Sequence, residues 1–282
     1  MPGGVEIIAH RGARSLAPEN TLTAARLAHK IGAHRWETDA ALTRDGELVL
    51  FHDETLTRCT NAAQVLGYDP QSPEKTLWSE RGTIDRLDSH TFVDLELLDA
   101  GSWFERDDPY ATVFDIDPQT LAGFKGECIP SLYDGLALTK DLDWSINVEL
   151  KDHGNEPEFN FHPARVLAEL SRSGISPDQV ALSSFNYDWL RFIRQHAPEY
   201  ELQALVGDRD DEALNFNDPL FTNAEFEVLN INALLVTPSD IRRLKGAGKR
   251  INLFTVNEPC DYMRFVNAGV DGLFTDFPQR FI

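Results

Sequence analysis

Short apolar runs recur along the chain, and in its second half they alternate with amphipathic segments that have the period of an α-helix. The apolar runs predict nine β-strands. These are Val5–Ala9, Arg35–Asp39, Leu48–Phe51, Ser145–Leu150, Gln179–Ser183, Glu201–Val206, Ile231–Val236, Ile251–Val256 and Val270–Thr275. The amphipathic segments predict helices at Thr21–Ile31, Phe161–Ser173, Tyr187–Ala197, Pro238–Gly246 and Pro259–Ala268.

Alternation of strand and helix over this length predicts an α/β fold with a parallel sheet covered by helices. Eight such units would close a (β/α)8 TIM barrel of about 250 residues. Because nine strands are predicted, one of them is surplus or lies outside the barrel. An open doubly wound sheet is the alternative, but the chain has no Gly-x-Gly-x-x-Gly turn to support a dinucleotide-binding version of it.

One pair of predicted strands is expected to be antiparallel. Arg35–Asp39 and Leu48–Phe51 are joined by a short link that contains Asp45-Gly46. A parallel crossover needs about a dozen residues or more. Asp-Gly is instead a strong signal for a two-residue hairpin turn.

The hairpin predicts a cluster of polar side chains without any assumption about the rest of the fold. With a two-residue turn, Arg44 faces Glu47, and counting back in register places Asp39 opposite His52. Glu37 lies on the same face because side chains alternate with period two. We therefore expect Glu37, Asp39 and His52 to gather, unless a bulge at the turn shifts the register by one residue.

Residues 53–127 do not follow the alternation of strand and helix. Segments 69–73 and 105–110 have loop composition, and Asp85–Leu98 contains a short helical pattern. We predict a single domain over residues 1–282 that carries residues 53–127 as a small inserted subdomain. The residues expected to form a small core there are Trp78, Phe92, Leu95, Leu98, Trp103 and Phe104.

The net charge of −20 narrows the function classes. Nucleic-acid binders usually show a basic stripe, and none is visible in the sequence. The acidity also argues against docking on an anionic membrane surface, and it promotes solubility. With 42% hydrophobic residues, the chain has ample material for a buried core.

The sequence predicts a soluble protein in the cytoplasm. Its three cysteines, Cys59, Cys128 and Cys260, are single and widely spaced, which suits a reducing compartment better than a disulfide framework. Met1–Ile8 lacks the pattern of a signal peptide. No apolar stretch approaches the roughly 20 residues that a transmembrane segment needs. The sequence does not indicate the oligomeric state.

Glu37, Asp39 and Glu149 are the candidate metal ligands. Two neighbouring buried carboxylates repel each other unless a cation lies between them, although both could be plain strand residues. Asn147, Glu149 and Lys151 share one face of their strand. Oxygen ligands favour Mg²⁺, Ca²⁺ or Mn²⁺ over zinc. Buried charged groups need partners. A metal and a phosphate would supply them for the inward-facing Glu149 and Lys151, and a simple ion pair between these two residues is the alternative.

His10, Arg11 and His52 are the candidates for phosphate chemistry. His10 ends the first predicted strand, and barrel enzymes keep catalytic groups at such strand-to-loop junctions. The planar guanidinium of Arg11 binds oxyanions bidentately, with a structural ion pair as the alternative. Either histidine could instead merely pack at a strand end. The other histidines have no comparable context; His153 is the least certain of them because it follows Lys151 closely.

These residues and their neighbours resemble the glycerophosphodiester phosphodiesterase family. The matching segments occur in family order and span nearly the whole chain, and they are highly specific together although each is weak alone. They are Ile8–Gly12, Ala17–Thr21, Glu37–Asp39, Leu42–Gly46, His52–Leu56, Arg58, Leu98–Phe104, Ile129–Leu132, Asn147–Lys151, Ser183–Phe185 and Asp271–Asp276.

The resemblance implies a (β/α)8 barrel with a small insertion after His52. It implies metal-dependent hydrolysis of a small-molecule glycerophosphodiester to glycerol 3-phosphate and an alcohol, a reaction of lipid and glycerol metabolism. The implied roles are His10 and His52 as the acid/base pair, Arg11 and Lys151 as phosphate-binding residues, and Glu37, Asp39 and Glu149 as ligands of Mg²⁺ or Ca²⁺, with Mn²⁺ as a further candidate.

Two other functions remain open at this point. One is a phosphodiesterase of the lysophospholipase D type that acts on lipid substrates; the other is a barrel that only binds phosphodiesters. The chain departs from the family pattern at Thr38, Cys59 and Phe254. The stretch 207–230 also fits the pattern poorly, and we expect it to shape the substrate pocket.

Overall fold

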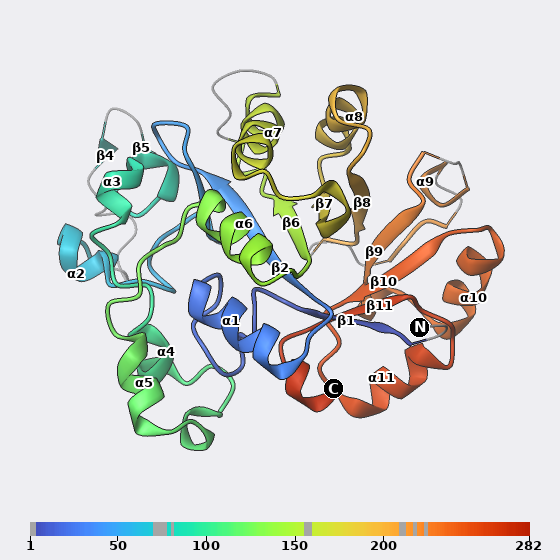
Figure 1. Cartoon of the computed structure of the whole chain (residues 1–282), viewed down its shortest axis with the longest axis horizontal. Helices are drawn as coiled ribbons and strands as arrows, with labels where there is room; N and C mark the ends of the chain where they lie inside the picture. The colour runs from blue at the N-terminus through green and yellow to red at the C-terminus, as the bar shows by residue number, and fades with distance from the viewer. Residues whose placement is uncertain are drawn as a thin grey trace.

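In the part of the chain that the computed structural model describes, eight parallel strands close into a barrel (Figure 1). The described residues are 4–69, 78–79, 82–154, 160–208, 213–216, 219–222 and 225–282. The barrel closes because β1 (Glu6–Ala9) pairs in parallel with both β2 (Arg35–Leu42) and β11 (Gly272–Thr275). The strands between them are β6 (Ile146–Leu150), β7 (Val180–Ser184), β8 (Glu201–Val206), β9 (Val228–Asn232) and β10 (Arg250–Phe254). The predicted fold class is therefore confirmed.

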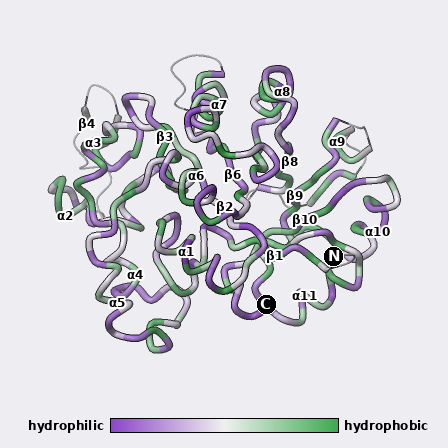
Figure 2. The backbone as a smooth tube through the Cα atoms, viewed as in Figure 1, coloured by the Kyte–Doolittle hydropathy of each residue, from purple (hydrophilic) through white to green (hydrophobic). Residues whose placement is uncertain are grey.

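Helices surround the barrel, and Figure 2 shows hydrophobic and hydrophilic residues mixed along them, as expected of helices with one buried face. They are α1 (Leu22–Ile31), α6 (Leu132–Asp141), α7 (Phe161–Ser173), α8 (Tyr187–His196), α9 (Pro219–Thr222), α10 (Pro238–Gly246) and α11 (Pro259–Val266). Local signals set their ends. The Thr21 side chain accepts a hydrogen bond from the Ala24 N–H at the start of α1, and Gly32 ends that helix with φ 101°. No described helix is both long enough and apolar enough to cross a membrane.

The ninth predicted strand, β3 (Leu48–Leu50), lies outside the barrel and pairs antiparallel with β2. Its register is one residue away from the predicted one: Ala40 faces Leu50, and the Phe51 N–H donates to the Asp39 carbonyl. The predicted pairing of Asp39 with His52 is therefore wrong. The reason is a three-residue loop, 44–46, in which Gly46 has φ 80° and the Thr43 N–H donates to the Glu47 carbonyl.

The strand predicted at Ile231–Val236 begins and ends earlier, at Val228–Asn232. Its second half forms a 3-10 turn, η5 (Ala233–Leu235), because the Asn232 side chain accepts a hydrogen bond from the Leu234 N–H. Other 3-10 turns in the described part of the barrel and insertion are η2 (Leu87–Ser89), η3 (Val113–Asp115) and η4 (Pro177–Gln179). A last one, η6 (Pro278–Arg280), follows β11.

The described residues of the stretch 53–127 form the group of short elements at the left of Figure 1. They are α2 (Ala62–Leu66), β4 (Trp78–Ser79), β5 (Gly82–Thr83), α3 (Phe92–Leu95), α4 (Trp103–Asp107) and α5 (Pro118–Phe124). A second hydrophobic cluster buries four of the residues predicted to form a small core, Leu95, Leu98, Trp103 and Phe104, and Phe92 packs against it. The Trp78 side chain and residues 70–77 lie outside the described part. The cluster also contains Val49 and Phe51, so the insertion packs on the β3 side of the barrel. The single-domain division with an insertion stays a prediction.

A layer of buried polar side chains crosses the barrel interior. Asn147 donates to Gln203 at 2.7 Å and accepts from Ser183 at 2.7 Å. Asn230 donates to the same Gln203 oxygen at 2.8 Å, and Asn252 donates to Asn230 at 2.9 Å. Because buried amides must find partners, this chain of hydrogen bonds fixes β6 to β10 relative to one another. The network includes β6, the strand that carries Glu149.

Candidate active site

A cavity of about 770 Å³ opens at the carboxyl ends of the barrel strands, which is the face where barrel enzymes bind substrates. His10, Arg11, His52, Glu149 and Lys151 line it. The two remaining predicted site residues, Glu37 and Asp39, are buried, with exposures of 3% and 0%. The structure therefore gathers all seven predicted site residues at one end of the barrel.

The three candidate metal ligands meet through the pairing of two parallel strands. β2 and β6 are in register so that Asp39 lies beside Glu149 and Glu37 beside Asn147. One carboxylate oxygen from each of Glu37, Asp39 and Glu149 lies within 4.8 Å of the others. The β2–β6 register thus brings together all three carboxylates, whereas the predicted hairpin accounted only for Glu37 and Asp39.

The acidic cluster has the chemistry of a site for a hard cation. Glu37 Oε1 and Asp39 Oδ1 are buried and have no hydrogen-bond partner among the described residues; the Lys151 ammonium lies 3.7 Å from Asp39 Oδ1. Burial, together with the charges of Asp39 and Glu149, raises the pKa of Glu37 well above its ordinary range. Buried, repelling carboxylates with unused oxygens fit a divalent cation with oxygen ligands.

Arg11 connects the cluster to its surroundings. Its backbone N–H donates to Glu37 Oε2 at 2.8 Å, and its Nε lies 3.1 Å from Asp39 Oδ2. Burial opposes ionisation of Asp39, but Arg11, His52 and Lys151 hold the pKa of this carboxyl below its usual value. Lys151 also donates to Glu149 Oε1 at 2.7 Å. The two cations predicted to hold phosphate therefore stand beside the carboxylates and reach the cavity.

His10 is held by an aspartate from the last strand. His10 follows β1 and Asp276 follows β11, and these strands are neighbours with Ala9 beside Thr275. His10 Nδ1 lies 2.7 Å from Asp276 Oδ1, while Nε2 lies 4.0 Å from Glu37 Oε2. Arg14 Nη1, which only donates, lies 3.3 Å from the same Nδ1, but the contact with the carboxylate, which only accepts, is shorter. Nδ1 therefore carries the proton in the neutral ring, and Nε2 is left for chemistry. Burial and the charge of Arg11 lower the pKa of His10 below 6.5, which favours this neutral ring at pH 7.

His52 is held in the same way by the next residue in the chain. Its Nδ1 lies 2.7 Å from Asp53 Oδ1, so its Nε2 is also available. Although burial opposes it, hydrogen bonds from His52 and Arg58 lower the pKa of Asp53 below its ordinary value, so Asp53 remains ionised. The His52 carbonyl lies 3.2 Å from His153 Nε2. His153, to which the sequence assigned no role, thus contacts the backbone of a site residue.

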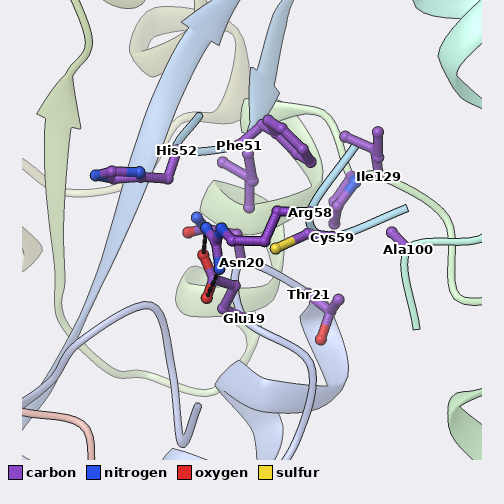
Figure 3. A pocket seen from close by; sticks show the side chains of 11 residues that line it. Glu19, Asn20, Thr21, Phe51, His52, Arg58, Cys59, Ala100 and Ile129 are labelled. Atoms are coloured by element: carbon purple, nitrogen blue, oxygen red, sulfur yellow. Dashed lines mark hydrogen bonds and ion pairs between the residues drawn. The ribbon is translucent and has the colours of Figure 1, made fainter. Parts of the chain in front are cut away.

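Several residues that the sequence argument did not assign complete the site. Asn20 donates to Asp39 Oδ2 at 2.9 Å and accepts from Thr38, which orients the buried carboxylate. Glu19 binds three arginines, and Figure 3 shows one of them, Arg58, lying over it. The available signals were the segment Pro18–Thr21, which matched the family pattern, and Asp276, which directly follows a predicted strand.

The sequence model of the glycerophosphoryl diester phosphodiesterase family matches residues 10–280. The chain belongs to this family. Family membership confirms the resemblance drawn from the sequence motifs and the predicted class of enzyme, a phosphoric diester hydrolase. Members of the glycerophosphoryl diester phosphodiesterase family generally depend on a divalent cation, in agreement with the cluster of Glu37, Asp39 and Glu149.

Relatives of the chain span more than one named specificity. The chain is 28% identical over 280 residues to a glycerophosphodiester phosphodiesterase of Caldanaerobacter subterraneus, a match that covers 98% of this chain and 96% of the relative. It is also 28% identical over 290 residues to a glycerophosphoinositol inositolphosphodiesterase of Mus musculus, a match that covers 99% of this chain and 47% of the relative. Among solved structures, it is similar to an Oleispira antarctica phosphodiesterase in complex with the product sn-glycerol-3-phosphate. That match has a TM-score of 0.75 and 26% identity and covers 98% of this chain and 94% of the other.

Proposed function

We propose that this protein hydrolyses glycerophosphodiesters to glycerol 3-phosphate and an alcohol. One observation carries the proposal: two histidines, each with Nδ1 held by an aspartate, line the same cavity as Arg11 and Lys151, above a cluster of three carboxylates. Family membership supports the reaction class. The product bound to the Oleispira antarctica relative, sn-glycerol-3-phosphate, supports the identity of the phosphate-bearing half of the substrate.

Glu37, Asp39 and Glu149 would hold the divalent cation in this proposal. Mg²⁺ and Ca²⁺ are the preferred candidates, with Mn²⁺ also compatible with an all-carboxylate set. When bound, the cation would offset negative charge on the phosphate oxygens. Arg11 and Lys151 supply the remaining positive charge beside the phosphate, Arg11 through a planar fork that also fixes orientation.

The two histidines divide the proton transfers. One accepts a proton at Nε2 from the attacking hydroxyl as the new phosphorus–oxygen bond forms. The other begins with protons on both ring nitrogens and donates the one on Nε2 to the alkoxide that leaves as the old phosphorus–oxygen bond breaks. The attacking hydroxyl belongs either to water or to the neighbouring carbon of the substrate's own glycerol. In the second case a cyclic phosphate forms as the alcohol leaves, and water then opens it to glycerol 3-phosphate. His10 suits the first role because burial and the charge of Arg11 lower its pKa, which favours the neutral ring that this role needs.

The alcohol half of the substrate faces the side of the cavity at the ends of β7, β8 and β10, which is lined by Phe185, Asp208 and Phe254. Of the stretch 207–230 expected to shape the pocket, residues 209–212, 217–218 and 223–224 lie outside the described part. The proposal includes the reaction's place in glycerol and lipid metabolism and the cytoplasmic location suggested by the unpaired cysteines, all three of which are free thiols.

The test is release of glycerol 3-phosphate from glycerophosphocholine by protein stripped with EDTA and then resupplied with Mg²⁺, Ca²⁺ or Mn²⁺. Restored release supports the proposal, and a set of other glycerophosphodiesters then gives the preferred alcohol. The Glu149→Gln protein, purified identically, controls for a contaminating phosphodiesterase. Release only from lysophospholipids would replace the proposal by a lysophospholipase D activity. Binding without turnover under every metal would replace it by a phosphodiester-binding barrel.

A further inference from the structure

The two histidine–aspartate pairs of the site are joined by a continuous path of ion pairs. From His10 the path runs through Asp276 to Arg14, whose Nη1 lies 3.5 Å from Asp276 Oδ1. Arg14 Nη2 donates to Glu19 Oε2 at 2.6 Å. A single arginine, Arg14, therefore links Glu19 to the carboxylate that holds His10.

On its other side, Glu19 reaches the second pair through Arg58. Arg58 donates to both Glu19 oxygens, at 2.9 and 2.7 Å, and to both Asp53 oxygens, at 2.6 and 3.0 Å. Asp53 in turn holds His52 Nδ1 at 2.7 Å. A guanidinium bound bidentately at two edges has little freedom to rotate. The position of Asp53, and with it the direction of the His52 ring, is thus fixed relative to Glu19.

We propose that Glu19 is a positioning residue that couples the orientations of His10 and His52. It is buried, with 6% of its surface exposed, and its two oxygens accept from three arginines, because Arg11 Nη1 also donates to Oε1 at 2.8 Å. The assignment rests on the proposed function, since it takes the two histidines as the groups that transfer protons.

The cost of burying this network favours positioning over stability as its role. Removing several charges from water is expensive, and an apolar cluster of similar volume often stabilises a protein equally well. The charges are nevertheless matched: Glu19, Asp53 and Asp276 face Arg11, Arg14 and Arg58. The insertion braces both bridging arginines, since Arg14 lies over the Tyr110 ring and Arg58 over the Trp103 ring. What the network adds beyond an apolar cluster is a fixed direction for each ring.

The test is the Glu19→Gln variant, with proton NMR of the imidazole Nδ1–H groups as a readout that does not depend on turnover. A histidine Nδ1–H bound to a carboxylate gives a far-downfield signal. Asp276→Asn and Asp53→Asn assign the two signals to His10 and His52. We expect Glu19→Gln to remove both signals and to lower kcat by at least about tenfold, with a smaller change in KM. Persistence of both signals, or loss of only one, would overturn the coupling. If the parent itself lacks turnover, the proposed function fails while the NMR result still decides the coupling.

A matched control and a second route keep the result unambiguous. Glu201 is partly buried and pairs with Arg35 and Arg250 at the opposite end of the barrel, so Glu201→Gln should keep both signals and the parent kcat. If Glu19→Gln does not fold, Arg14→Gln and Arg58→Gln replace it. Arg14→Gln should remove only the His10 signal and Arg58→Gln only the His52 signal; a signal retained in its own variant overturns the proposal.

Discussion

The two histidine–aspartate pairs have the same contact distance but are built in different ways. Asp276 is 266 residues from His10 and reaches it only because β1 and β11 are neighbours in the closed barrel. Asp53 directly follows His52, so their contact forms within the loop after β3, where Arg58 donates to both Asp53 oxygens. Equal distances of 2.7 Å thus have different origins. A pair made by barrel closure reports on the whole fold, whereas a local pair reports on one loop.

The surroundings of the two aspartates differ as well. Asp276 has 11% of its side chain exposed and accepts a second hydrogen bond, from Asn257 at 2.8 Å. Asp53 has 21% exposed and depends on Arg58, whose own side chain is 41% exposed. The His10 pair is thus anchored in the barrel wall, and the His52 pair is anchored by an arginine at the edge of the cavity.

The largest expected effect comes from removing either histidine. His10→Ala and His52→Ala should each lower kcat by roughly 10²–10⁴-fold, because each removes a group that transfers a proton. Steady-state kinetics on glycerophosphocholine checks this, with circular dichroism to verify folding. Near-normal turnover in a folded variant would remove that histidine from the mechanism.

Replacing each aspartate by asparagine should distinguish the two pairs by the loss of kcat. Asp276→Asn should lower kcat by about 100-fold and Asp53→Asn by about tenfold, because the more buried carboxylate is harder for water to replace as an acceptor. Asp271→Asn serves as a control, since Asp271 precedes β11 and pairs with Lys245 outside the cavity. Equal losses in the two aspartate variants would contradict the comparison.

The free energy of unfolding should also distinguish the pair of His10 and Asp276. Burial opposes ionisation, but the hydrogen bond and charge of His10 lower the pKa of Asp276 to about 2. A depressed folded-state pKa stabilises the protein above the unfolded value of about 3.8, and the gain is lost as the pH falls toward 2. Asp276→Asn should therefore lower the free energy of unfolding by roughly 2 kcal/mol at pH 6. Urea unfolding at pH 6 and pH 3 checks the sign: the difference from the parent should shrink at pH 3, and a constant difference would contradict it.

The smallest effect is expected at the opposite end of the barrel. Glu201→Gln removes a partly exposed ion pair, so it should change the free energy of unfolding by no more than about 1 kcal/mol and leave kcat at the parent value. Thermal unfolding and the same kinetic assay measure both. A loss of activity in this variant would mean that the two ends of the barrel are coupled.

The fold was largely predictable because its strands carry strong local signals. The nine apolar runs match eight barrel strands and β3, and the surplus strand is the one next to Asp45-Gly46. The hairpin register was not predictable from that dipeptide, because a two-residue and a three-residue loop both place Gly in the left-handed region. Gly46, with φ 80°, belongs to the longer loop, and every opposed pair shifts by one residue.

The candidate site was predictable where residue type and spacing carried information. Glu37, Asp39 and Glu149 share strand faces, and β2–β6 pairing brings them together despite the error in the hairpin. Glu19 and Asp276 were not assigned, because their roles depend on contacts between segments distant in the chain. Nothing local to Glu19 tells that three arginines will surround it; only the folded barrel brings Arg11, Arg14 and Arg58 to one carboxylate.

The contact between His10 and Asp276 also determines how late in synthesis the complete site can form. A ribosome adds about 5–20 residues per second. The 266 residues between the two side chains therefore take on the order of 13–53 seconds to synthesise. During that interval the His52 pair can already form, while His10 waits for its partner. The nascent chain thus carries one oriented ring and one unoriented ring until β11 has been made and has paired with β1.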